Sequence, residues 1–126
     1  MELKHMSDQE LARRMVNYIE RLERLYREIS NHIEHKEADA GYIKCEYAAL
    51  KSAIRSDADY VSKQRNREGS LLYTSNFTPY ILEADAFGFA VPTNARIDFK
   101  MFSAVKEAHY KLTKGWTLEQ WQKAAQ

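Results

Sequence analysis

The stretch from Ser7 to His32, SDQELARRMVNYIERLERLYREISNH, decides the fold. Large apolar side chains recur along it with 4-3 spacing, at Met15, Tyr18, Leu22, Leu25 and Ile29. This spacing places them on one face of an α-helix and is typical of a coiled-coil seam. Ser7 and Glu10 form a capping box at the start. The stretch therefore predicts an amphipathic helix over about 8–32, on the order of 40 Å long.

A second helix is expected after Asp39, which is a suitable N-cap. Its apolar face would consist of Ile43, Tyr47, Leu50, Ile54, Ala58 and Val61. Gly69 follows it at a position where a helix ends. The apolar seam of the second helix continues the heptad register of the first. Two arrangements therefore remain open at Gly41: an antiparallel hairpin, which we favour, and one continuous helix of about 60 residues.

The C-terminal part predicts three shorter helices. Thr78-Pro79 is a favourable helix start, and Gly88 would end that helix. Thr93 or Asn94 would cap the next helix, which runs to Gly115. Thr117 opens a last helix through a second capping box, with the tryptophans at 116 and 121 at the staple positions. The apolar run at 71–74 is either a short strand or a connector. We expect a mainly α, single domain over 6–126, with a helical hairpin at 6–68 and a C-terminal helical part at 69–126.

The composition supports this fold and narrows the function classes. The chain has 126 residues with only four glycines and two prolines, too few turn residues for a many-stranded sandwich or barrel. Its net charge of +1 excludes a whole-protein field that would attract nucleic acid or anionic lipid. No apolar run reaches the length of a membrane helix. A single cysteine, Cys45, suggests a reducing, cytoplasmic setting.

Sequence motifs for enzyme chemistry are sparse. His32 and His35 share a helical stretch with Glu28, but no second cluster completes a metal site. Arg27 to His32 matches the R-x4-H pattern of HEPN-type helical ribonucleases, although Glu23 is a ready structural partner for Arg27. The four isolated glycines provide no phosphate-binding loop. We therefore expect no enzyme activity, no metal and no cofactor, with a helical ribonuclease that uses the R-x4-H motif as the alternative.

A basic patch provides one alternative function. It lies at the end of the second helix and consists of Lys51, Arg55, Lys63, Arg65 and Arg67. Such a patch could contact phosphates in a nucleic-acid-binding regulatory protein. Cations near a helix C-terminus also stabilise the helix dipole, which explains the same residues without a ligand.

Two sets of residues predict a protein interface. Small side chains with 4-3-4 spacing form a stripe on the second helix, at Cys45, Ala49, Ser52 and Ser56. Aromatic residues gather around both prolines, at Phe77, Tyr80, Phe87 and Phe89. The stripe would be either solvent-exposed or a second packing surface, and the aromatics either core or a partner or ligand surface. Our leading hypothesis is a non-enzymatic interaction module of the assembly, adaptor or inhibitor type, and we expect a homo-oligomer.

Overall fold

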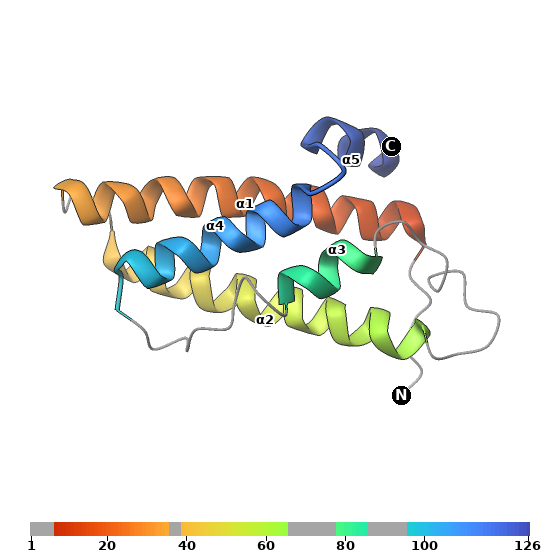
Figure 1. Cartoon of the computed structure of the whole chain (residues 1–126), viewed down its shortest axis with the longest axis horizontal. Coiled ribbons are helices and arrows are strands. Elements are labelled where there is room, and N and C mark those ends of the chain that lie inside the picture. The colour runs from red at the N-terminus through yellow and green to blue at the C-terminus, as the bar shows by residue number, and fades with distance from the viewer. Residues whose placement is uncertain (1–6, 36–38, 66–77, 86–95) are drawn as a thin grey trace.

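The computed structural model describes residues 7–35, 39–65, 78–85 and 96–126. Within these ranges the chain forms five helices and no strand. They are α1 (Asp8–His35), α2 (Ala40–Arg65), α3 (Thr78–Glu83), α4 (Phe99–Thr113) and α5 (Leu118–Ala125) (Figure 1). The mainly α prediction is confirmed. The apolar run at 71–74 and two of the predicted stop residues, Gly69 and Gly88, lie outside the described residues.

The two long helices form an antiparallel hairpin, because α2 returns along α1 (Figure 1). The hairpin arrangement is therefore confirmed over the single continuous helix. α2 begins after Asp39, whose carboxylate accepts the Tyr42 amide at 3.2 Å and whose carbonyl accepts the Ile43 amide at 3.1 Å. Gly41 consequently lies in the first turn of α2 and not in the turn of the hairpin.

The seams identified in the sequence form the core. Ser7 caps α1, with the Glu10 amide donating to its Oγ at 3.1 Å. The fully buried side chains of the hairpin that are larger than alanine are those of Leu11, Met15, Ile19, Leu22, Leu25, Ile29, Ile43, Tyr47, Leu50, Ile54 and Val61. Burying each such side chain contributes about 1.5–3 kcal/mol before entropy is counted. The periodicity therefore located both the helices and their inward faces.

A small polar cluster interrupts this apolar hairpin interface. Asp57 on α2 is only 4% exposed. Its carboxylate accepts hydrogen bonds from the Arg14 guanidinium at 2.7 Å and from the Tyr18 hydroxyl, both on α1. Burial and the hydrogen bond to Asp57 raise the pKa of Tyr18 above its ordinary value. Because the buried carboxylate is paired on both oxygens, the cluster fixes the register of α1 against α2.

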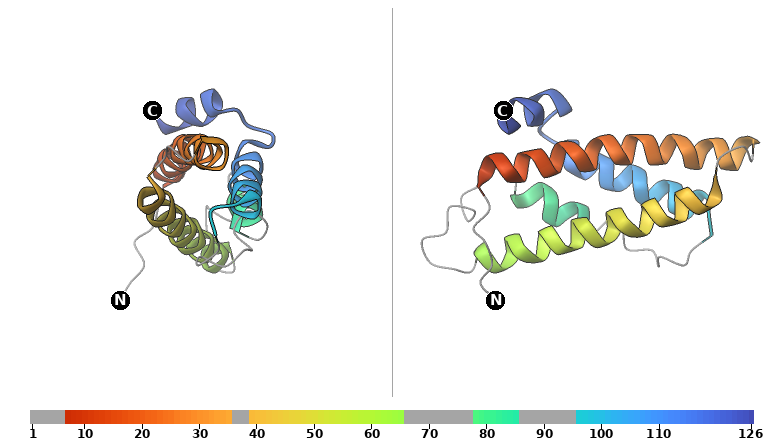
Figure 2. Two further views of the ribbon diagram at one scale, coloured as in Figure 1. Left: turned by 90° about the vertical axis from the view of Figure 1, so that its left-hand side faces the viewer. Right: turned by 180° about the vertical axis from the view of Figure 1, so that it is seen from behind.

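The C-terminal helices cover one side of the hairpin. Seen along the hairpin, α3 and α4 lie together beside α1 and α2, and α5 lies on the outside of α1 (Figure 2). α4 begins later than predicted, so the assignment of Thr93 or Asn94 as its N-cap is wrong. Asp98 is the N-cap, because its carboxylate accepts the amides of Lys100 and Met101 at 2.9 and 3.2 Å. Residues 93 and 94 lie outside the described residues.

The last helix is anchored as the sequence predicts. Thr117 and Gln120 form a reciprocal capping box, and the ring centroids of Trp116 and Trp121 lie 4.6 Å apart. Trp121 is fully buried and its Nε1 donates to the Leu112 carbonyl at 2.9 Å. Gly115 joins α4 to α5 with a φ of 94°, in the left-handed region that favours glycine.

Candidate functional site

α4 has two apolar faces, of which only one is buried. The inward face carries the buried residues Met101, Ala104, Val105, Ala108 and Leu112. The opposite face carries Phe99, Phe102, Lys106 and Tyr110, which we call the α4 ridge. At 100° per residue these four positions fall within about 80° of one another. The fold therefore places a second, partly aromatic surface on the outside of the bundle.

The aromatic rings of the α4 ridge are unusually open to solvent. Phe99 is 70% exposed and Tyr110 is 56% exposed, and they are the exposed large hydrophobic residues of the described part of the chain. Phe102, between them, is half-buried. Lone exposed apolar residues need no explanation, whereas several on one face mark interaction sites more often. The α4 ridge is therefore the strongest candidate for a binding surface.

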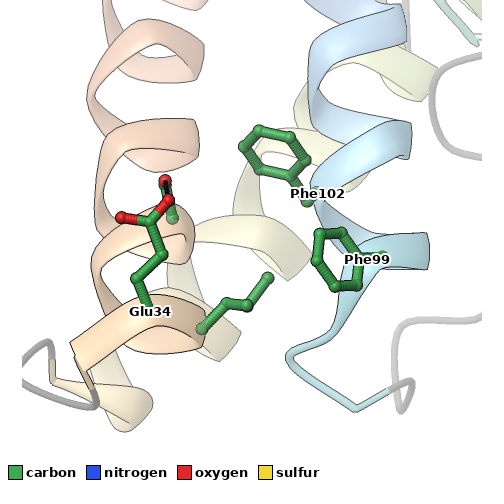
Figure 3. Close-up of a pocket in the computed structure, with 5 residues that line it drawn as sticks. Glu34, Phe99 and Phe102 are labelled. Atoms are coloured by element: carbon green, nitrogen blue, oxygen red, sulfur yellow. Dashed lines mark hydrogen bonds between the residues drawn. The ribbon is translucent and has the colours of Figure 1, made fainter.

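A shallow pocket lies at the N-terminal end of the α4 ridge, where α4 faces the last turns of α1 (Figure 3). Its volume is about 90 Å³. The lining residues are Ser30, Ile33 and Glu34 of α1 and Phe99 and Phe102 of α4. The side chain of Glu34 lies along α1 on the opposite wall (Figure 3), and its carboxylate accepts a hydrogen bond from the Ser30 hydroxyl at 3.5 Å. The pocket combines apolar walls with a polar edge, a combination that suits a specific ligand or side chain.

The charges around the pocket are distributed unevenly. Arg96 and Lys100 flank Phe99, and the Lys106 ammonium lies 5.3 Å from the centre of the Phe102 ring. Within the described part of the chain, no ion pair joins these three cations to a carboxylate. The neighbouring Asp98 carboxylate is occupied by the helix cap. The aromatic end of α4 is consequently a site of local positive charge.

The opposite end of α4 is electrostatically balanced. The Lys111 ammonium lies 3.6 Å from the Glu107 carboxylate and 3.9 Å from that of Glu83. Lys114 also pairs with Glu83, at 3.2 Å. Between the two ends, His109 Nε2 contacts the Glu23 carboxylate of α1 at 3.1 Å, which secures α4 against α1. Among the described cations in and next to α4, those without an ion pair therefore lie before the helix or in the part of it that ends at Lys106.

The small-residue stripe of α2 lies on the surface. Cys45, Ala49, Ser52 and Ser56 are all exposed, so the described C-terminal helices do not cover them. Of the predicted aromatic set, Phe77, Phe87 and Phe89 lie outside the described residues. Tyr80 is half-buried, and its ring meets that of Trp121 edge-on at 5.9 Å. Tyr80 thus packs against the described core.

The basic patch on α2 is partly neutralised. Arg55 lies 3.6 Å from the Asp85 carboxylate, and Lys63 lies 2.9 Å from that of Asp59. Burial and the neighbouring Arg55 lower the pKa of Lys51. Within the patch, the side chain of Arg65 and the whole of Arg67 lie outside the described part of the structure. The described cations of this patch therefore present less net charge than the sequence suggests.

The residues considered for catalysis lie apart. Arg27 is exposed, whereas the Nδ1 atom of His32 is buried. Five residues apart on a straight helix, they are separated by about 140° around the axis of α1. His35 pairs with the adjacent Glu34 at 3.7 Å. Among the described residues, no group of three or more His, Cys, Asp or Glu side chains is placed to hold a metal ion.

Sequence reasoning missed the α4 ridge, although a signal for it is present. Phe99, Phe102 and Tyr110 follow the spacing i, i+3, i+11 with Lys106 at i+7, opposite the stripe that begins at Met101. When a helix carries apolar residues on two faces and packs against the bundle through one of them, the other face stays exposed.

Comparison with protein-family models, with curated proteins and with solved structures gave no match. Among the described helices, none is both long enough and apolar enough to cross a lipid bilayer.

Proposed function

We propose that this chain is a non-enzymatic protein-interaction module that binds a partner through the α4 ridge and the adjoining pocket. The observation that carries this proposal is the exposure of Phe99 and Tyr110 on a helix whose opposite face is fully packed. Exposed aromatic side chains lose solvent contact without a large entropy cost when a partner covers them. For this reason aromatic residues dominate the binding energy of many protein interfaces.

The architecture of the bundle supports the same proposal. α4 is held by its own buried face, by the Asp98 cap and by the contact of His109 with Glu23. The α4 ridge therefore lies on a helix that is held in place by residues outside the exposed part of the ridge. A preorganised surface of this kind reduces the cost of ordering side chains on binding.

The proposal is tested by comparing what co-purifies with the wild type and with the double variant Phe99→Ser/Tyr110→Ser. Quantitative mass spectrometry of the two samples should show at least one protein that is depleted tenfold or more with the variant. A second variant, Ser52→Arg, places a large charged residue on the small-residue stripe of α2 and should retain that protein.

The same experiment evaluates the other hypotheses. A second, differently tagged copy of the chain is expressed alongside. If the chain forms the expected homo-oligomer, this copy co-purifies with the first, and the variant that loses it identifies the surface involved. Loss of the partner only with Ser52→Arg would move the interface to α2. Recovery of nucleic acid in place of protein, or an identical protein set from all variants, would contradict the proposed function.

A further inference from the structure

We infer that the partner segment recognised by the α4 ridge is an acidic peptide of a partner protein, one that places an aliphatic side chain in the pocket between α1 and α4. This inference rests on the proposed function and adds the chemistry of the partner. It follows from the charges beside Phe99, from the size and walls of the pocket, and from the position of Glu34.

The charge complementarity comes from three cations. Arg96 and Lys100 lie close to Phe99 in the sequence and Lys106 lies over the Phe102 ring, and none of the three has a carboxylate partner in the described part of the structure. The remaining α4 lysine, Lys111, is paired. Opposing charges at the rim of an interface steer association and select among partners. A partner rich in Asp and Glu would therefore be favoured over a neutral or basic one.

The spacing of these cations limits where the acidic groups lie. Lys100 and Lys106 are six residues apart on α4, which corresponds to about 9 Å along the helix axis and about 120° around it. An extended peptide advances about 3.3 Å per residue, so carboxylates at least three residues apart are needed to reach both ammonium groups. The expected motif is therefore two acidic residues at least three positions apart, with an aliphatic residue close by.

The pocket itself selects an aliphatic side chain. Its volume of about 90 Å³ is smaller than the roughly 150 Å³ cavity that holds a benzene molecule. Its walls are the apolar surfaces of Ile33, Phe99 and Phe102 (Figure 3). A Leu, Ile or Met side chain matches the apolar chemistry of these walls.

Glu34 favours a peptide over a nucleic acid. Its side chain is 64% exposed and lines the pocket on the α1 side, where the carboxylate accepts a hydrogen bond from the Ser30 hydroxyl. A nucleic-acid strand carries a phosphate at every nucleotide, so a strand crossing the pocket would bring negative charge close to Glu34. A peptide avoids this repulsion, because it can place its carboxylates toward Lys100 and Lys106 and an uncharged residue beside Glu34.

The test is a selection from a displayed library of random 12-residue peptides on the immobilised full chain. The enriched peptides should contain an aliphatic residue and at least two acidic residues in the spacing described. Fluorescence anisotropy then measures the affinity of the best peptide for the wild type and for three variants.

Two of the variants test the cations of α4 and the pocket separately. Lys100→Glu/Lys106→Glu reverses the charge and should weaken binding at least tenfold. Ser30→Leu fills the pocket from the α1 side without changing the charge and should weaken it by a similar factor. The matched control, Lys44→Glu/Lys123→Glu, reverses two exposed lysines on α2 and α5 and should change the affinity less than twofold. Circular dichroism verifies that all variants are folded.

Three results would overturn the inference: enrichment of basic or uncharged peptides, no enrichment above the empty matrix, or equal affinity for all variants. Tighter binding of a 20-nucleotide single-stranded RNA that depends on the same residues would assign the surface to nucleic acid. If a partner lost with Phe99→Ser/Tyr110→Ser binds through a segment that is not acidic, the proposed function stands and this inference fails.

Discussion

Asp57 is the buried charged residue of the described chain, and it joins α2 to α1 through hydrogen bonds. Its carboxylate accepts hydrogen bonds from both the Tyr18 hydroxyl and the Arg14 guanidinium. Sequence periodicity did not identify it, because the residue lies among apolar positions of α2 and its partners are 39 and 43 residues away. Long-range polar pairs of this kind become visible only when the two helices are placed side by side.

The first prediction concerns this cluster. Asp57→Asn should lower the free energy of unfolding by about 2 kcal/mol, because a charged hydrogen bond is lost and buried polar groups are left poorly paired. Urea denaturation measures the change. The control is Asp59→Asn two residues away, which breaks an exposed pair with Lys63 and should cost less than about 0.5 kcal/mol. Equal costs for the two variants would show that Asp57 does not hold the hairpin.

A second prediction concerns alkaline pH. Burial raises the pKa of Tyr47 from its ordinary 10.0 to about 12. Because the folded-state pKa is the higher one, the full stability is present below about pH 10 and is lost as the pH rises through about 12. A shift of two units corresponds to a loss of up to about 3 kcal/mol.

Unfolding free energies measured from pH 9 to pH 12 test this expectation. Tyr47→Phe should lose less stability over that range than the wild type, since it has no hydroxyl to ionise at that position. Tyr110→Phe alters an exposed tyrosine and should follow the wild-type profile. Parallel profiles for the wild type and Tyr47→Phe would rule out Tyr47 as a source of the alkaline loss.

At the scale of the elements, the turn between α4 and α5 depends on Gly115. A Cβ atom at this position would lie 2.3 Å from the Tyr80 hydroxyl oxygen and 3.0 Å from Cζ, and the φ of 94° disfavours any other residue. Gly115→Ala should therefore cost about 2 kcal/mol, from backbone strain and from displacement of Tyr80. Near-ultraviolet circular dichroism should change as well, because Tyr80 packs on Trp121.

A double-mutant cycle separates the two causes. In a Tyr80→Phe background the closest clashing atom is absent, so Gly115→Ala should cost less than it does in the wild type. Gly41→Ala, inside the first turn of α2, should change stability by less than about 1 kcal/mol. An undiminished cost in the Tyr80→Phe background would show that the clash with the Tyr80 hydroxyl does not contribute.

The sequence predicted most of the elements but not all of their boundaries. The seams of α1 and α2, the Asp39 start and the Thr117 capping box are local patterns, and all are present. The start of α4 was misplaced because Thr93, Asn94 and Asp98 are all residue types that favour the N-cap position. Asp98 is the one that caps it, at the start of a helix whose first buried residue is Met101.

At the scale of the whole molecule, the sequence did not reveal which apolar surfaces stay uncovered. The inward face of α4 and the α4 ridge both carry apolar residues, so the sequence alone does not tell which of the two is buried. Only the packing of α1 and α3 against one of them leaves Phe99 and Tyr110 exposed. The small-residue stripe of α2 illustrates the same limit, because its spacing was visible but its exposure was not.

The central claim is that a partner protein covers the α4 ridge. The most direct test replaces Phe99 with a photo-crosslinking phenylalanine derivative in cells that make this chain, with the same replacement at Ser52 as the reference. We predict a discrete protein adduct from position 99 that position 52 does not form. Adducts from position 52 alone, an adduct to nucleic acid, or no adduct from position 99 would contradict the claim.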